Sequence, residues 1–217
     1  MGSLQRPSRP ALILLACFAL ISLLVATGVT LPWDEAALRV VGGWRQPALT
    51  DLMLAATFAG NGDVELPLAL GIVLLLWRLG KAALAKRYLL VALSVELLYV
   101  VLKASFHRPR PSIIPRLGEA GWYSYPSGHS MLAPVIWTFG LLLLARLVPS
   151  RVGRAALVGL GLVAPIAIAA SRVYLGVHYP SDVVGALLIG SAWVVWCWPP
   201  SVDPSSNAST SSAPAIR

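Results

Sequence analysis

The sequence predicts an all-α polytopic membrane protein, a bundle of six transmembrane helices with interfacial helices in its first outer loop. The chain is 57% hydrophobic and only 12% charged, whereas about 25% of the residues in soluble domains are charged. Its mean hydropathy is +0.75. Apolar segments also recur at close to the roughly 20 residues that a membrane-crossing helix needs. We expect a single domain over 1–198 and a disordered cytoplasmic tail, rich in Ser, Ala and Pro, over 199–217.

The six predicted spans follow from the apolar segments taken in chain order. The first begins soon after Arg9, is longer than the apolar core of a signal peptide and lacks a clear cleavage site before Pro32. We therefore interpret it as a retained span. Cys17 and Cys197 lie in apolar segments and belong to no metal-binding spacing. The spans are expected at about 11–31, 62–79, 87–106, 129–147, 154–172 and 182–198.

The region 33–59 differs from these segments. It begins with Trp33 and Asp34, continues through further charged residues and Trp44, and ends in a shorter apolar stretch before Asn61. This mixture is typical of helices that lie in the membrane interface. The alternative is a seventh span over 48–60, which is short for a crossing.

The distribution of cations predicts the orientation in the membrane. Six spans place three basic clusters on one side, and cytoplasmic loops carry the excess of Lys and Arg. Both termini are then cytoplasmic. The net charge of +8 is explained by these short loops, so we expect no nucleic-acid partner. The clusters are Arg6 and Arg9; Arg78, Lys81, Lys86 and Arg87; and Arg146, Arg151 and Arg154.

The opposite face carries cations that this rule does not explain, and an anionic ligand would account for them. They are Lys103, Arg108, Arg110, Arg116 and Arg172. His129, His178 and Asp182 are expected on the same extracytoplasmic face. Asp182 follows His178 by four residues, so on a helical turn the carboxylate can hold one imidazole nitrogen and leave the other as a nucleophile or base.

The remaining polar residues on this face suit a phosphoryl group. Lys103, Arg110 and Arg172 can donate hydrogen bonds to its oxygens. Ser127 and Gly128 begin a predicted helix, whose free backbone N–H groups favour an anion. His129 can protonate a leaving oxygen.

These stretches, K-x6-R-P, P-S-G-H and S-R-x5-H-x3-D, span roughly residues 100–185. Because it carries these three stretches in this order, the chain resembles the type 2 phosphatidic acid phosphatase superfamily. The resemblance is specifically to the membrane lipid phosphatase branch, which is related to vanadium haloperoxidases. The resemblance implies that His178 is the nucleophile and forms a phosphohistidine, that Asp182 orients it, and that His129 is the acid and then the base. It also implies that a cluster of residues clamps the phosphate without a metal or other cofactor, namely Lys103, Arg110, Ser127, Gly128 and Arg172.

The resemblance implies a lipid substrate that is held in the bilayer, with its headgroup at the outer face of the membrane. It also implies that this membrane is a bacterial plasma membrane. Undecaprenyl pyrophosphate, phosphatidic acid, phosphatidylglycerol phosphate and diacylglycerol pyrophosphate all remain open, and the oligomeric state is not predicted. Two alternatives remain: a phosphotransferase that passes the group to a lipid or sugar, and a non-catalytic protein that binds or transports lipid phosphates.

Three further residues have less defined expectations. We interpret His107 as an incidental interfacial residue, and Arg108 as one that assists phosphate binding through its charge. Glu96 lies within the third span, where an ionisable side chain is costly. It is expected either to bond a neighbouring helix or to support Lys103.

Overall fold

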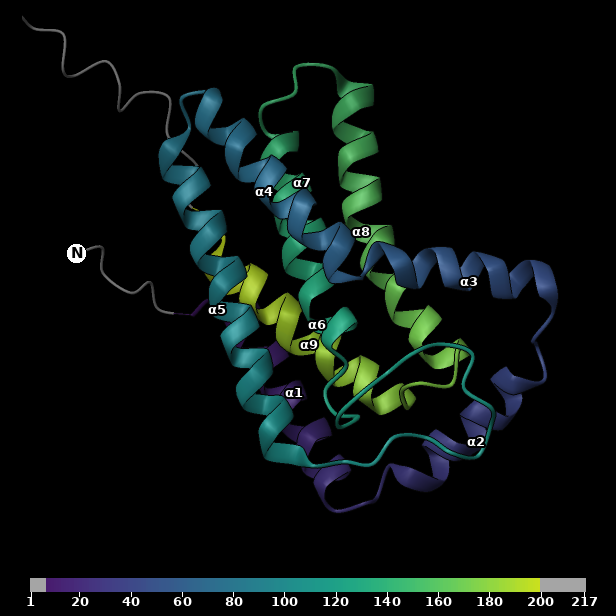
Figure 1. Cartoon of the computed structure of the whole chain (residues 1–217). Coiled ribbons are helices and arrows are strands. Elements are labelled where there is room, and N and C mark those ends of the chain that lie inside the picture. Colours follow the sequence, from purple (N-terminus) through teal and green to yellow (C-terminus); the bar gives the residue numbers. More distant parts are fainter. Residues whose placement is uncertain (1–6, 200–217) are drawn as a thin grey trace, which may run out of the picture.

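The computed structural model describes residues 7–199, and every regular element among them is helical (Figure 1). The expected tail falls, from residue 200 onward, outside the described residues. The elements are α1 (Arg9–Ala26), α2 (Leu31–Gly42), α3 (Pro47–Ala59), α4 (Gly62–Arg78), α5 (Ala82–Phe106), α6 (Gly128–Ala133), the π-helical turn η1 (Pro134–Phe139), α7 (Gly140–Ala145), α8 (Arg151–Tyr174) and α9 (Pro180–Cys197).

Five helical stretches of residues 7–199 are long and apolar enough to cross a membrane, and a bent pair raises the number to six. α6, η1 and α7 together form one of the five, Gly128–Ala145. The bent pair is α3 with α4, which meet at 47°. The prediction of an all-α bundle of membrane-spanning helices is therefore confirmed. A separate seventh span over 48–60 is not supported, because α3 alone has only 13 residues.

The first span is shorter than expected, because α1 ends at Ala26 rather than near residue 31. Gly28 has a φ of +75°, a left-handed conformation that glycine adopts without a steric penalty. The chain therefore turns sharply, and α2 starts at Leu31 with Pro32 in its first turn, where the missing N–H of proline costs little.

The span formed by α6, η1 and α7 is the central helix of the bundle. Within it 67% of the residues are buried, against 17% in the spanning windows of α1 and of α5. Glycine permits a close contact with α9, since a Cβ on Gly190 of α9 would lie 2.4 Å from the carbonyl oxygen of Met131. Apolar side chains from α4, α5 and α9, including Ile72, Tyr88 and Ile189, form one core with residues of this helix such as Phe139.

The end of α5, the starts of α6 and α9 and the end of α8 gather at one end of the bundle. The long connection from α5 to α6 runs across this end, passes near α2 and returns to the bundle (Figure 1). The three sequence motifs lie on these helix ends and on this connection. The fold therefore brings together stretches that the sequence separates by tens of residues.

Candidate active site

A cavity of about 290 Å³ opens at this end of the bundle. Six of the eight predicted site residues line it: Lys103, Arg110, Gly128, His129, Arg172 and His178. Its other lining residues are Tyr99, Glu119, Ala120 and Gly121. A larger, mostly apolar groove of about 1010 Å³ runs along α7, α8 and α9 and contains none of the predicted site residues.

Asp182 contacts His178 as the four-residue spacing predicts. The Nδ1 atom of His178 lies 3.3 Å from Oδ2 of Asp182, and both side chains are buried. His178 precedes α9, and Asp182 is in the first turn of that helix. The same Oδ2 atom accepts a hydrogen bond of 2.9 Å from the backbone N–H of Tyr179 and another from the hydroxyl of Ser124. The carboxylate thus fixes both the imidazole and the start of α9.

The other imidazole nitrogen of His178 faces the cavity residue Arg110. Nη1 of Arg110 lies 3.0 Å from Nε2 of His178. Burial lowers the pKa of His178 to about 3 despite the opposing effect of Asp182, and the charge of Arg110 lowers it further. The ring is therefore neutral at physiological pH. With Nδ1–H directed at Asp182, the lone pair on Nε2 is available for a nucleophilic attack.

Lys103 is almost fully buried near the end of α5. Its Nζ atom donates to the carbonyl oxygens of Ser124 and Pro126, at 3.2 and 2.9 Å. These bonds attach the segment before α6 to the end of α5. They leave the ammonium group at the cavity wall, where it can face an anion.

Arg110 and Arg172 enter the cavity from the long connection and from α8. Arg110 donates to the carbonyl oxygens of Gly121 and Val177, at 2.6 and 2.8 Å, and burial lowers its pKa. Arg172 donates to the hydroxyl of Thr57 at 2.6 Å. Among the described residues, its Nε is buried without an acceptor. Such a group favours a ligand that can accept its proton in a hydrogen bond.

Gly128 and Ser127 have different positions at the start of α6. Gly128 lines the cavity and packs closely on α5, since a Cβ there would lie 2.9 Å from the ring of Tyr99. Ser127 does not line the cavity. Its hydroxyl accepts a bond of 2.9 Å from Ser130, and its N–H donates to the carbonyl oxygen of Asp182 at 3.3 Å. In this structure Ser127 therefore joins α6 to α9 behind the cavity.

His129 faces the break between α3 and α4. Its Nε2 atom lies 2.8 Å from Oδ1 of Asn61, at the start of α4. Gly60 makes this approach possible, because a Cβ there would lie 3.0 Å from Cδ2 of His129 and 2.6 Å from Ile168. The bend in the α3–α4 pair is therefore packed against a predicted catalytic residue.

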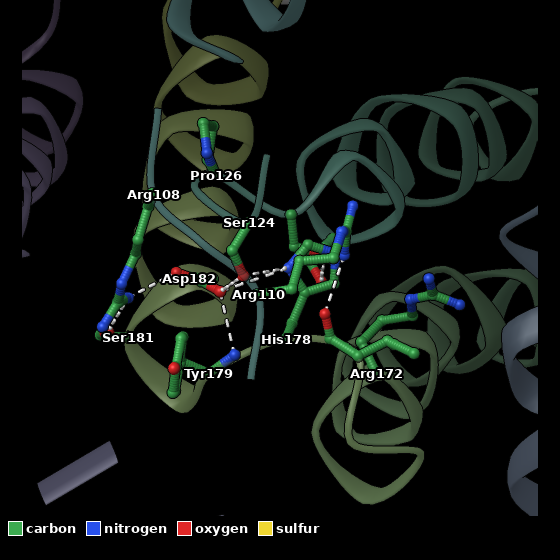
Figure 2. Close-up of polar contacts among 12 residues, drawn as sticks. Arg108, Arg110, Ser124, Pro126, Arg172, His178, Tyr179, Ser181 and Asp182 are labelled. Atoms are coloured by element: carbon green, nitrogen blue, oxygen red, sulfur yellow. Dashed lines mark hydrogen bonds and ion pairs between the residues drawn. The ribbon is translucent and has the colours of Figure 1, made fainter. Parts of the chain in front are cut away.

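Sequence reasoning missed several residues that contact the site. Thr57 belongs to the region expected to be interfacial and Asn61 follows it closely, and their spacing carries no recognisable signal. Ser124 precedes the P-S-G-H stretch without being part of the pattern. Arg108, expected to assist phosphate binding through its charge, does not line the cavity. Figure 2 shows Arg108 and His178 on opposite sides of the Asp182 carboxylate.

Known proteins resemble this chain over most of its length. The family model described as PAP2 superfamily matches residues 84–202. Phosphatidylglycerophosphatase B of Bacillus subtilis is 31% identical over 175 residues, which cover 80% of this chain and 85% of that protein. An undecaprenyl-diphosphatase of Sulfolobus acidocaldarius is 36% identical over 72 residues, which cover 33% of this chain and 30% of that protein.

A solved structure supports the same relationship. The crystal structure of a transmembrane PAP2-type phosphatidylglycerolphosphate phosphatase from Bacillus subtilis superposes with a TM-score of 0.81 at 28% identity. The match covers 88% of this chain and 94% of that chain. The family model spans more than half of the sequence, and the similarity extends over nearly the whole fold. The chain therefore belongs to the PAP2 superfamily and is an integral membrane protein of that family.

Proposed function

We propose that this chain is a phosphatase that hydrolyses a lipid phosphate or diphosphate through a phosphohistidine on His178. The observation that carries the proposal is the position of His178: a neutral imidazole whose Nε2 faces a cavity lined by three cationic side chains. Lys103, Arg110 and Arg172 neutralise the charge of a phosphoryl group and stabilise it in the transition state.

In the first step, Nε2 of His178 attacks phosphorus and forms a P–N bond. The bond between phosphorus and the leaving oxygen breaks, its electron pair stays on that oxygen, and protonated His129 donates a proton to it. The imidazole becomes positively charged, and the carboxylate of Asp182 at Nδ1 stabilises that charge. Arg110 must first move from Nε2, and the phosphoryl oxygens offer its guanidinium new acceptors.

In the second step, water attacks the phosphohistidine while His129 accepts a proton from it. The P–N bond breaks, its electron pair returns to Nε2 of His178, and inorganic phosphate leaves. The backbone at Gly128 and the Nε of Arg172, which has no acceptor within residues 7–199, are suited to hold the phosphoryl oxygens in both steps.

The membrane arrangement supports a lipid substrate whose tail stays in the bilayer. The basic loops after α4 and α7 lie away from the motif-bearing helix ends, and the positive-inside rule makes that side cytoplasmic. We therefore place both termini in the cytoplasm and the cavity at the extracytoplasmic face. The names of the relatives favour phosphatidylglycerol phosphate and undecaprenyl pyrophosphate as the substrates to test first.

The test is phosphate release by detergent-purified protein from a lipid panel, beside a His178→Ala variant. The panel contains undecaprenyl pyrophosphate, phosphatidylglycerol phosphate, phosphatidic acid and diacylglycerol pyrophosphate. Release by wild type and not by the variant supports the proposal, and the order of kcat/KM values identifies the substrate. Folded wild-type protein that releases no phosphate from any of these lipids overturns it.

A further inference from the structure

Arg108 connects two buried carboxylates that lie far apart in the sequence. Its Nη1 donates to Oδ1 of Asp182 at 2.5 Å, and its Nη2 donates to Oδ2 of Asp34 at 2.7 Å. The side chain of Arg108 is 9% exposed, and those of Asp182 and Asp34 are 0% and 4% exposed. Because solvent barely reaches these groups, their charges interact strongly and none can be left unpaired at low cost.

Asp34 also holds the start of α9. Its Oδ1 accepts a bond of 2.9 Å from the backbone N–H of Ser181, and its Oδ2 accepts one of 2.5 Å from the Ser181 hydroxyl. That hydroxyl in turn accepts a bond of 2.8 Å from Nη1 of Arg108. Ser181 directly precedes Asp182, so α2 and the long connection together fix both the backbone and the side chain of the His178 partner.

The two oxygens of Asp182 have separate partners. Oδ2 faces His178, Ser124 and the N–H of Tyr179, whereas Oδ1 faces Arg108. Burial opposes the charge of Arg108, but Asp182 and Asp34 outweigh this effect, so the pKa of Arg108 is raised. The guanidinium is thus a permanent cation that favours the ionised form of Asp182.

We propose that Arg108 and Asp34 are positioning residues, which keep the Asp182 carboxylate in place against His178, and that Arg108 is not a phosphate ligand. This rests on the proposed function, because it assigns a role within that reaction. α2 then forms part of the catalytic machinery, although Asp34 lies outside the segment 84–202 that the family model matches.

The experiment compares Arg108→Gln and Asp34→Asn with Arg39→Gln. Arg39 lies on α2, like Asp34, and pairs with Glu35 at 3.1 Å on the surface, so it is a matched control. We expect each of the first two variants to lower kcat by about tenfold or more. The KM for lipid and the inhibition constant of inorganic phosphate should change by less than about threefold. The control should match wild type.

A second measurement separates positioning from a general loss of structure. In an Asp182→Asn background, Arg108→Gln should cause no further loss of kcat, because Arg108 acts through Asp182. Arg108→Lys should recover part of the lost kcat, since an ammonium group can pair with one of the two carboxylates. Thermal unfolding in detergent identifies variants that fail to fold. If Arg108→Gln is one of them, wild type is compared with Arg108→Lys and Asp34→Asn instead.

Specific outcomes overturn the inference. A weaker inhibition constant for phosphate with kcat preserved makes Arg108 a ligand, and independent effects in the Asp182→Asn background exclude action through Asp182. If wild-type protein releases no phosphate, the proposed function fails instead. The positioning claim is then decided by NMR of the His178 ring, whose Nδ1–H resonance should shift in Arg108→Gln because Asp182 is no longer held against it. An unchanged resonance contradicts it.

Discussion

The Nε2 atom of His129 lies 2.8 Å from the amide oxygen of Asn61, across the break between α3 and α4. An amide oxygen only accepts hydrogen bonds, so this contact places a proton on Nε2. In the neutral ring Nδ1 is then the nitrogen that can accept a proton, and in the protonated ring it is the one that can donate. Asn61 therefore orients His129 much as Asp182 orients His178.

Replacing Asn61 should reduce turnover more than substrate binding. We expect Asn61→Ala to lower kcat by about tenfold, because one orienting hydrogen bond of about 1.4 kcal/mol is lost. The KM for lipid should change little. Steady-state phosphate release measures both constants, and Asp51→Asn, on the exposed surface of α3, is the control. A raised KM with an unchanged kcat would assign Asn61 to substrate binding.

His178→Ala should abolish turnover and the covalent intermediate together. The chain contains three histidines, and His107, which packs against Tyr123, offers a control of the same residue type. With a lipid labelled on the reacting phosphate, rapid quenching should trap acid-labile phosphate on wild type and on His107→Ala. The His178→Ala rate should be lower by about a thousandfold or more. Label retained on His178→Ala would place the nucleophile elsewhere.

The stability of the protein should fall in acid partly through His178. Burial lowers the pKa of His178 from 6.5 to about 3, so below pH 6.5 the unfolded chain binds a proton that the folded protein does not. The contribution of this residue to stability is complete above pH 6.5 and is lost as the pH falls toward 3. Thermal unfolding in detergent should show a steeper acid decline for wild type than for His178→Gln. Parallel profiles would contradict a strongly depressed pKa.

A methyl group should be tolerated at the start of α4 but not at the start of α6. A Cβ on Gly128 would lie 2.9 Å from the Tyr99 ring at the cavity wall, whereas a Cβ on Gly62 would have no neighbour within 4 Å. We expect Gly128→Ala to lower kcat/KM by about tenfold, and Gly62→Ala to have little effect. Equal kcat/KM values for the two variants would show that the cavity adapts to the added methyl group.

Phosphate release should persist after exhaustive dialysis against EDTA. Three side-chain cations at the cavity, from Lys103, Arg110 and Arg172, can supply the charge neutralisation for which many phosphoryl-transfer enzymes use Mg²⁺. The comparison is the release rate before and after chelation at fixed ionic strength. Activity that is lost on dialysis and restored by one divalent ion would contradict the metal-free mechanism.

The sequence predicts the helices and the cavity residues because both signals are local. A span is recognisable from its apolar length, and the spacing of His178 and Asp182 follows from one helical turn. Lys103, Arg110 and Gly128 lie within short motifs at predicted span ends, so the bundle needs only to bring these ends together. The predicted cavity residues therefore meet in the structure, apart from Ser127, which lies behind it, and Asp182, which contacts His178 from outside the lining.

The residues that orient the histidines could not be found in the same way. Asn61 reaches His129 only because the chain bends by 47° between α3 and α4, and Asp34 reaches Ser181 only because α1 ends early and the chain turns at Gly28. These are consequences of packing between distant segments, for which neither periodicity nor motif spacing gives a signal. Nor does any pattern pair Arg108 with Asp34, because the two residues lie 74 positions apart in the sequence.

The contact between the first and last described helices has a consequence for how the enzyme matures. α1 packs against α9, and Asp182 lies in the first turn of α9. Asp34 and Arg108 are synthesised much earlier than Asp182, so their buried charges have no complete set of partners until α9 enters the membrane. On the proposed mechanism we expect a nascent chain that stops after α8 to be inactive, so the synthesis of α9 would complete the enzyme.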